Sequence, residues 1–256
     1  MKCLVIMPTY NEKENAPKLI SAVLAVNPVL DVLVVDDNSP DGTAVTIGGL
    51  MKDLRLPSQN VFLETRPKKL GLGSAYSGGF KWGLDRGYEF LIQMDADWSH
   101  HPKYLTEMLS KSTLADFVIG SRYVRGGGTM GWGLFRRLLS RFGSFYARSI
   151  LGTSIHDFTG GFNGWRAEVL REIGTDTLAS DGYSFQIELK FLAAKLGFSH
   201  LEFPIIFEER RNGQSKMSPT IVHEAIWRVW WLRFHRFSLG SVRKRETLRN
   251  PDLRNF

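Results

Sequence analysis

The sequence predicts an α/β fold with a mostly parallel sheet and helices on both of its faces. Short apolar runs rich in valine and isoleucine alternate with longer amphipathic stretches, as parallel strands joined by crossover helices do. The 256 residues are 43% hydrophobic, which is enough for one large core. Two of the apolar runs end in pairs of aspartates, and open parallel sheets bind ligands at such carboxyl ends of strands.

Each strand is expected at a short apolar run, and each helix at the amphipathic stretch that follows. The expected strands are Leu4–Met7, Val32–Val35, Val61–Leu63, Phe90–Met94 and Phe117–Gly120. The expected helices are Lys13–Ala25, Thr43–Arg55, Ser74–Arg86 and Pro102–Leu109. After Gly120 the alternation gives way to a glycine-rich stretch, an arginine-rich helix and mixed structure. We expect one domain at 1–240 and a basic tail at 241–256, which has few large apolar residues.

The net charge and the cysteine content indicate which class of partner the protein binds and in which redox environment it works. The formal net charge of +7 favours an anionic partner, such as a nucleic acid, an acidic lipid surface or a phosphorylated small molecule. Cys3 is the only cysteine, so an intrachain disulfide is excluded and a reducing, cytosolic setting is expected. No run reaches the roughly 18 uninterrupted apolar residues of a membrane span. Any contact with a membrane is therefore expected to be peripheral.

The stretch LIQMDADWSHHP, residues 91–102, drives an apolar run into Asp95 and Asp97. Two carboxylates at the end of a strand suit Mg²⁺ or Mn²⁺, which would in turn hold a diphosphate. A solvated loop that caps the next helix is the alternative. A zinc site at His100 and His101 is disfavoured, because adjacent histidines in an extended segment point apart and no cysteine is near in sequence.

Two further stretches follow predicted strands. VVDDNSPDGT, residues 34–43, places Asp36 and Asp37 where a carboxylate can accept a hydrogen bond from a base N–H or a ribose hydroxyl, with simple turn chemistry as the alternative. Both acidic pairs are expected to face one cleft. GLGSAYSGG, residues 71–79, lacks the third glycine of a dinucleotide loop in register and follows the third strand. It is expected to form a turn and a helix that packs tightly through small residues.

Residues 134–151 form a helical pattern with an apolar side and a basic side. The apolar side comprises Leu134, Phe135, Leu138, Leu139, Phe142, Phe145, Tyr146 and Ile150, and the other side Arg136, Arg137, Ser140, Arg141, Ser144 and Arg148. Arg136 and Ser140 are four residues apart, which would make a reasonable cradle for a phosphate. An ordinary helix with its charged face in water is the alternative.

A second amphipathic helix is expected near Ile226. Its aromatic face would comprise Trp227, Trp230, Trp231, Phe234 and Phe237, with arginines beside it. A membrane-interface helix and a helix with a buried face both fit this pattern.

Eight motifs occur in order along the chain. They are PTYNE (8–12), VVDDNSPDGT (34–43), GLGSAY (71–76), MDADWSHHP (94–102), GSRYV (120–124), RRLLS (136–140), GYSFQIE (182–188) and ERRNGQSKMS (209–218). Together they resemble the dolichol-phosphate (polyprenol-phosphate) mannose synthases, which are family 2 glycosyltransferases of GT-A fold. The resemblance covers about residues 2–235 and is greatest to short, actinobacterial-type members without C-terminal membrane spans. It implies a Rossmann-like GT-A catalytic domain over 1–240, with amphipathic interface helices near 134–151 and 221–237.

The resemblance also implies roles for individual residues. The guanosine part of GDP-mannose would contact Pro8, Tyr10, Glu12, Val35 and Asp37. Asp95, Ala96 and Asp97 would hold the diphosphate and its Mg²⁺ or Mn²⁺ ion, with Ser99 at the position of a glutamine metal ligand in some relatives. Arg122, Arg136 and Ser140 would address phosphates of donor and acceptor, and Arg210 and Lys216 would clamp the donor. The candidate catalytic residues are Asp95, Asp97 and Arg122. Asn163 stands where an arginine is usual.

The implied reaction transfers mannose from GDP-mannose to dolichyl or polyprenyl monophosphate and inverts it to a β-mannosyl phosphate. With a second pKa of about 6, the acceptor is largely dianionic at neutral pH and can attack without a protein base. A related enzyme that uses UDP-glucose is one alternative. A nucleic-acid-binding module is another, but it would leave the acidic strand ends unexplained.

The implied location is the cytoplasmic face of a membrane, with peripheral attachment to its surface. A membrane-spanning partner subunit is left open, and no nucleic acid is expected as a partner.

Overall fold

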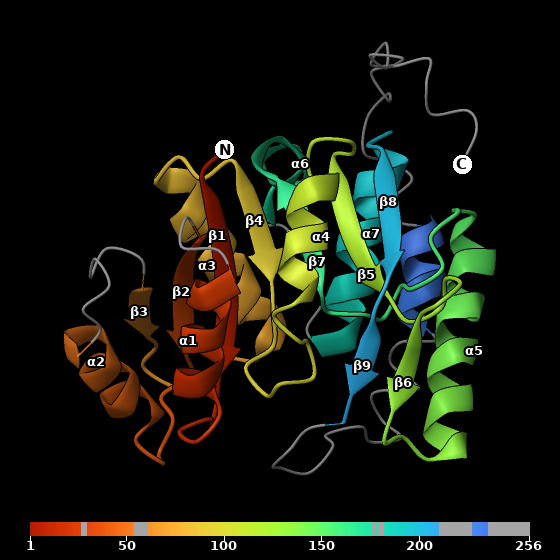
Figure 1. Ribbon diagram of the computed structural model, residues 1–256. Coiled ribbons are helices and arrows are strands. Elements are labelled where there is room, and N and C mark those ends of the chain that lie inside the picture. Colours follow the sequence, from red (N-terminus) through yellow and green to blue (C-terminus); the bar gives the residue numbers. More distant parts are fainter. Residues whose placement is uncertain (27–29, 54–60, 176–177, 179–181, 210–226, 235–256) are drawn as a thin grey trace.

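The computed structural model describes residues 1–26, 30–53, 61–175, 178, 182–209 and 227–234 (Figure 1). Its main sheet has seven strands in the order β3-β2-β1-β4-β7-β5-β8. These strands are β1 Cys3–Thr9, β2 Leu30–Asp36, β3 Val61–Thr65, β4 Phe90–Gln93, β5 Phe117–Ser121, β7 Asn163–Arg166 and β8 His200–Pro204. Neighbours in this sheet pair in parallel, except that β7 runs antiparallel to both β4 and β5. A small parallel sheet joins β6 (Gly128–Met130) to β9 (Ile206–Glu208).

Helices cover both faces of the main sheet, as predicted (Figure 1). They are α1 Ala16–Val26, α2 Thr43–Asp53, α3 Leu72–Asp85, α4 Tyr104–Lys111, α5 Leu134–Leu151, α6 Ala167–Ile173 and α7 Gly182–Lys195, with a further helix at 227–234. In β1, Leu4 and Ile6 point to the core shared with α3, α6 and α7, whereas Val5 and Met7 point to the core shared with α1, α2 and α4. The predicted α/β class is therefore confirmed, and the central residues Leu4–Met7 of β1 are all apolar because both faces of the strand are buried.

Glycines bring α3 into close contact with the sheet. A Cβ atom added at Gly79 would lie 2.5 Å from Cγ2 of Ile6, and one at Gly83 would lie 2.6 Å from Cδ2 of Leu91. The predicted helix packed through small residues is thus confirmed.

Helix α5 has the predicted bounds, but its apolar side faces outward. Ser140, Ser144 and Ala147 are buried against the body of the protein. Exposed fractions of 58–79% are found for Leu134, Phe135, Leu138, Phe142 and Phe145. Arg137 and Arg141 are exposed, as the alternative of an ordinary helix with its charged face in water expects, but an ordinary surface helix would also bury its apolar side and this one does not.

The helix at 227–234 also exposes aromatic side chains. Trp227, Trp230 and Phe234 are exposed, while Val229 and Leu232 are buried in the core. Trp231 packs against that core, so the prediction that it shares the aromatic face is wrong.

Phe237 and the basic tail lie outside the described residues. Within the ranges described, no helix combines the length and hydropathy needed to cross a bilayer.

The adjacent glycines of α3 offer a test of this packing. Gly79→Ala should destabilise the protein by about 1–3 kcal/mol, because the methyl group collides with the β-branched Ile6. Gly78→Ala, which adds a methyl group with nothing within 4 Å, should stabilise it by up to about 1 kcal/mol. Urea denaturation of both variants measures the difference, and a shift of the same sign in both would contradict the packing argument.

Candidate functional site

Most of the predicted donor residues lie at or just after the carboxyl ends of three adjacent strands, β2, β1 and β4, which point downward in Figure 1. In the parallel register of β1 and β2, Pro8 lies opposite Val35. The N–H of Asp37 donates to the carbonyl of Thr9 at 3.0 Å, and the N–H of Met94 donates to the carbonyl of Ile6 at 3.1 Å. The segments that carry Asp37 and Asp95 therefore leave the sheet at the same end, one on each side of β1.

The two carboxylates of the Asp-Ala-Asp motif are held in different ways. Asp95 Oδ1 accepts the hydroxyl of Tyr76 at 2.9 Å, and its side chain is 26% exposed. Asp97 Oδ1 accepts both the N–H and the hydroxyl of Ser99, at 3.1 and 2.5 Å. Trp98 has a φ of 67°, a left-handed conformation that turns the chain back between them. Ser99 therefore orients Asp97 whether or not its oxygen also binds a metal.

The buried side chain of His100 contacts the same turn. Burial lowers the pKa of this histidine, so its ring is neutral. Its Nδ1 accepts the N–H of Asp95 at 3.1 Å. This contact orients the backbone at the metal motif and gives His100 a structural role next to Asp95.

These acids suit a hard divalent cation in chemistry, although they do not make a complete metal site. Among the residues that the structure describes, no group of three or more His, Cys, Asp or Glu is gathered so that it could hold a metal ion. Asp95 and Asp97 provide carboxylate oxygens, and a bound diphosphate and water would have to provide the rest.

The acids after β2 do not both face the site. Asp36 is fully buried and accepts the hydroxyls of Thr9 at 2.8 Å and Ser39 at 2.6 Å. The expectation that it faces the cleft is wrong, because turn chemistry takes up its oxygens. Asp37 pairs with Arg66 and accepts the N–H of Gly71 at 3.1 Å, so it ties β2 to the segment before α3.

The other donor candidates lie around this segment. Tyr10 places its ring under Nζ of Lys69, 3.8 Å from the centroid. Glu12 accepts the side-chain amide of Asn15 at 2.9 Å. Arg210 and Lys216 lie outside the described residues.

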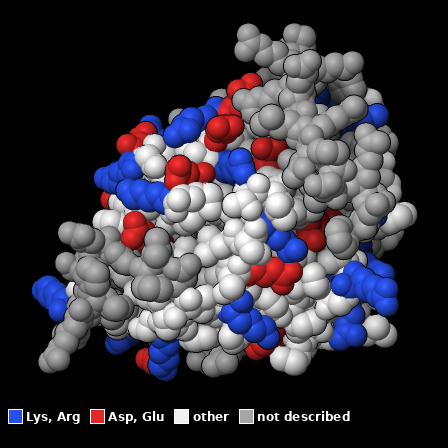
Figure 2. Space-filling model, turned by 45° about the horizontal axis from the view of Figure 1, so that its top comes forward, with Lys and Arg blue, Asp and Glu red and all other residues white. Residues whose placement is uncertain are grey.

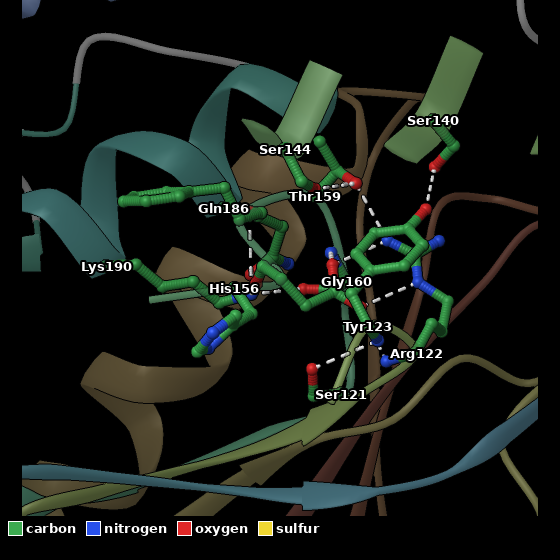
Figure 3. A network of polar contacts seen from close by, with 12 residues as sticks. Ser121, Arg122, Tyr123, Ser140, Ser144, His156, Thr159, Gly160, Gln186 and Lys190 are labelled. Carbon is green, nitrogen blue, oxygen red and sulfur yellow. Dashed lines mark hydrogen bonds and ion pairs between the residues drawn. The ribbon is translucent and has the colours of Figure 1, made fainter. Parts of the chain in front are cut away.

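Arg122 forms a buried ion pair that the sequence did not reveal (Figure 3). Its Nε and Nη2 donate to the two carboxylate oxygens of Asp157 at 2.8 and 2.7 Å, and Nη2 also donates to the hydroxyl of Thr159 at 2.7 Å. Burial alone would raise the pKa of Asp157, but the guanidinium holds it at about 2. Asp157 lacked any spacing signal because its partner is 35 residues away.

The three predicted phosphate-binding residues come together around two aromatic rings. The guanidinium carbon of Arg136 lies 4.1 Å from the centroid of Trp132, and that of Arg122 lies 5.6 Å from it. Ser140 Oγ accepts the hydroxyl of Tyr123 at 2.7 Å. Sequence reasoning missed both rings, since nothing in the spacing of Trp132 or Tyr123 links them to α5.

Loop 157–161 connects this arginine group to the metal motif. Gly160 donates its N–H to Asp157 Oδ1 at 2.8 Å. A Cβ atom added at the next residue, Gly161, would lie 3.7 Å from Asp95 Oδ2. Arg122 and Asp95 therefore lie at the two ends of one short loop.

Two curated relatives match nearly the whole chain. The polyprenol monophosphomannose synthase of Mycolicibacterium smegmatis is 46% identical over 236 residues, which is 91% of this chain and 88% of the relative. The undecaprenyl-phosphate mannosyltransferase of Micrococcus luteus is 46% identical over 230 residues, 90% of this chain and 93% of the relative.

Solved structures share the fold at low sequence identity. Glucosyl-3-phosphoglycerate synthase from Mycobacterium tuberculosis, solved with Mn²⁺, UDP-glucose and phosphoglyceric acid, has a TM-score of 0.64 and 16% identity over 91% of this chain and 79% of that one. A mannosyltransferase from Pyrobaculum calidifontis, solved with GDP-mannose and Mn²⁺, has a TM-score of 0.55 and 18% identity over 94% and 76%. The sequence family described as Glycosyl transferase family 2 matches residues 4–174. This chain belongs to glycosyl transferase family 2 and has the GT-A fold.

Proposed function

We propose that this enzyme transfers mannose from GDP-mannose to the phosphate of a polyprenyl or dolichyl monophosphate and inverts the anomeric centre. The observation that carries the proposal is the placement of Arg122 and Asp95 at opposite ends of loop 157–161. Both 46% identical relatives are named for mannose transfer to a polyprenyl phosphate. An anionic acceptor and an anionic leaving group need cationic surroundings on both sides, which this arrangement can supply.

On the donor side, we assign the guanosine to the edge formed by Pro8, Tyr10, Glu12, Val35 and Asp37. Asp37 would shape this edge through Arg66 and the N–H of Gly71, which it already engages. The assignment of Arg210 and Lys216 as donor clamps rests on the motif resemblance alone.

For the diphosphate we propose a Mg²⁺ or Mn²⁺ ion held by Asp95 and Asp97, beside Ala96. When bound, such an ion would neutralise the charge that develops on the GDP leaving group. Tyr76 and Ser99 each donate a hydrogen bond that fixes one of the two carboxylates. The protein's part is thus to hold both acids in one orientation, as outer ligands of metal sites commonly do.

On the acceptor side, Arg122, Arg136 and Ser140 would receive the lipid phosphate. A phosphate dianion is itself the nucleophile, so the chain has to orient it and offset its charge, and no general base is required. The Trp132 ring lies 4.1 Å from the guanidinium carbon of Arg136 and 5.6 Å from that of Arg122, which limits the movement of both groups. Arg136 also pairs with Glu209 at 3.0 Å, so a phosphate oxygen would have to compete with that carboxylate.

Two exposed apolar faces support peripheral attachment to a membrane. They are the outer side of α5 and the aromatic residues of the helix at 227–234. Exposed apolar patches of this kind mark contacts with proteins or membranes. A polyprenyl tail stays in the bilayer, so an enzyme that uses it must bring its site to the surface, and α5 carries Ser140 as well as the apolar side.

The two alternative functions make different demands on the surface and the donor site. Across the face that Figure 2 shows, basic and acidic side chains are intermingled, so that face offers no continuous basic surface to a nucleic acid. UDP-glucose is distinguished from GDP-mannose by a direct assay. With polyprenyl phosphate and Mn²⁺, label from GDP-mannose should appear in the organic phase, and excess UDP-glucose should not compete. Label from UDP-glucose alone would overturn the proposed donor.

The metal role is tested by pairing a ligand variant with its neighbour. Asp97→Asn should abolish transfer at every Mn²⁺ concentration, while its melting temperature stays near that of the wild type because the amide can still accept from Ser99. Ser99→Ala should raise the Mn²⁺ concentration for half-maximal rate by about 10- to 100-fold. Active Asp97→Asn enzyme would rule out the metal assignment.

The acceptor role of Arg136 is tested by separating the two Michaelis constants. Arg136→Ala should raise the KM for a short polyprenyl phosphate about tenfold, the scale of one charge-assisted hydrogen bond, and leave that for GDP-mannose nearly unchanged. Arg137→Ala, an exposed neighbour, should change neither. Equal increases for both substrates would place Arg136 at the donor.

Membrane contact is tested by the double change of Phe135 and Leu138 to serine, which removes two exposed side chains. Binding to anionic liposomes should weaken at least about tenfold, because each side chain that enters the interface contributes roughly 1–3 kcal/mol. Wild-type binding should also fall with added salt. Leu114→Ser, which removes an exposed leucine after α4, is the control. Unchanged binding by the double variant would refute the docking surface.

A further inference from the structure

We propose that Lys190 is a positioning residue for Arg122: its ammonium group fixes loop 157–160, whose Asp157 carboxylate holds the guanidinium toward the acceptor phosphate. This inference rests on the proposed acceptor. Lys190 lies outside the eight motifs that carry the family resemblance. Its hydrogen bonds go to loop 157–160 and not to Asp95 or Asp97.

The ammonium group of Lys190 lies at the centre of the loop's carbonyls (Figure 3). The side chain comes from α7 and is fully buried. Its Nζ donates to the carbonyls of Asp157 at 2.7 Å and Gly160 at 2.8 Å, and the carbonyl of Phe158 is at 3.4 Å. Three carbonyls thus match the three donors of an ammonium group.

A carboxylate binds the backbone N–H groups at the start of the same loop. Glu202 of β8 accepts the N–H groups of His156 at 2.8 Å and Asp157 at 3.0 Å. With the carbonyls on Lys190 and the N–H groups on Glu202, the backbone of the loop has one orientation. This orientation of the backbone sets the direction of the Asp157 side chain, which in turn positions the Arg122 guanidinium through two hydrogen bonds.

A purely packing role does not explain a charge at this position. Neighbouring residues of α7, such as Leu189 and Leu192, are apolar and buried in the core. A buried ammonium costs free energy that a methionine of similar length would avoid. The positive charge is explained by the loop carbonyls that it binds. This loop contacts Arg122 through Asp157, and the residue that follows it, Gly161, lies beside Asp95.

The charge on Lys190 is set by groups from each element around it. Burial lowers the pKa of Lys190 to about 8, while Asp157 raises it, Arg122 lowers it and Glu202 raises it. His156 and His200 lie next to Glu202. The ammonium is therefore lost as the pH rises through about 8, and the neutral amine keeps only two donors for three carbonyls.

Stability and acceptor binding should then respond to alkaline pH in opposite directions. A free lysine titrates near 10.5, so between pH 8 and 10.5 the unfolded chain binds more protons than the folded one. In this window the contribution of Lys190 to stability becomes more favourable as the pH rises. Weaker acceptor binding in the same window would therefore not reflect unfolding caused by this group.

The experiment measures the Kd of farnesyl phosphate for the full chain by calorimetry, which needs no sugar donor. In Lys190→Met, binding at pH 7 should weaken about tenfold, while the KM for GDP-mannose stays within a factor of about two. The wild-type Kd should rise between pH 7 and 9, and that of Lys190→Met should stay flat. Lys195→Met, on the same helix, should resemble the wild type.

Several results would overturn the proposal. Unchanged affinity in a folded Lys190→Met protein would do so, as would a wild-type Kd that is constant from pH 7 to 9 with circular dichroism unchanged. The wild-type measurement decides the matter even if the variant does not fold. A wild type that binds farnesyl phosphate but uses another sugar donor would refute the proposed donor and leave the Lys190 role standing. A wild type that binds no prenyl phosphate would refute both.

Discussion

The buried pair between Arg122 and Asp157 sets the geometry on which the rest of the site depends. Both groups are almost completely removed from water, and two parallel hydrogen bonds join them. Removing one partner of such a pair leaves a buried charge and costs roughly 3–5 kcal/mol. The pair also anchors loop 157–161, which ends beside Asp95. This interaction therefore fixes Arg122 to the loop that ends beside Asp95.

The antiparallel strand β7 explains how that loop reaches the site. An antiparallel strand begins at the edge where its parallel neighbours end, so the segment before it lies at the carboxyl ends of β4 and β5. Asn163, its first residue, pairs with Gln93 of β4 and Ile119 of β5. If β7 ran parallel to β4 and β5, loop 157–161 would lie at the opposite ends of these strands, away from Asp95 and Arg122.

Helix α5 matches the two chemical halves of the proposed acceptor. Small hydroxyl residues on its inner side allow close packing and reach the arginine group, through Ser144 to Thr159 and through Ser140 to Tyr123. Its outer side is apolar and exposed. A lipid phosphate has an anionic head and an apolar tail. The inner side of α5 can contact the head, while its outer side can contact the membrane that holds the tail.

The sequence by itself determined the α/β class, the strands β1, β2, β4 and β5, the bounds of α5 and the presence of acids at strand ends. Buried strands and amphipathic helices leave local periodic patterns, and these patterns can be read without knowing what packs where. The ordered motifs added the family and most candidate residues, including Arg122, Arg136 and Ser140.

Only the tertiary structure decided which of those residues act together. Asp36 and Asp37 are adjacent and both buried, yet the oxygens of Asp36 accept hydrogen bonds from Thr9 and Ser39 whereas Asp37 pairs with Arg66 and the N–H of Gly71. Asp157 and Lys190 have partners 30 or more residues away, and no local pattern records such pairs. Periodicity likewise shows that α5 has an apolar side but not whether that side is covered, because burial depends on what the rest of the chain places against it.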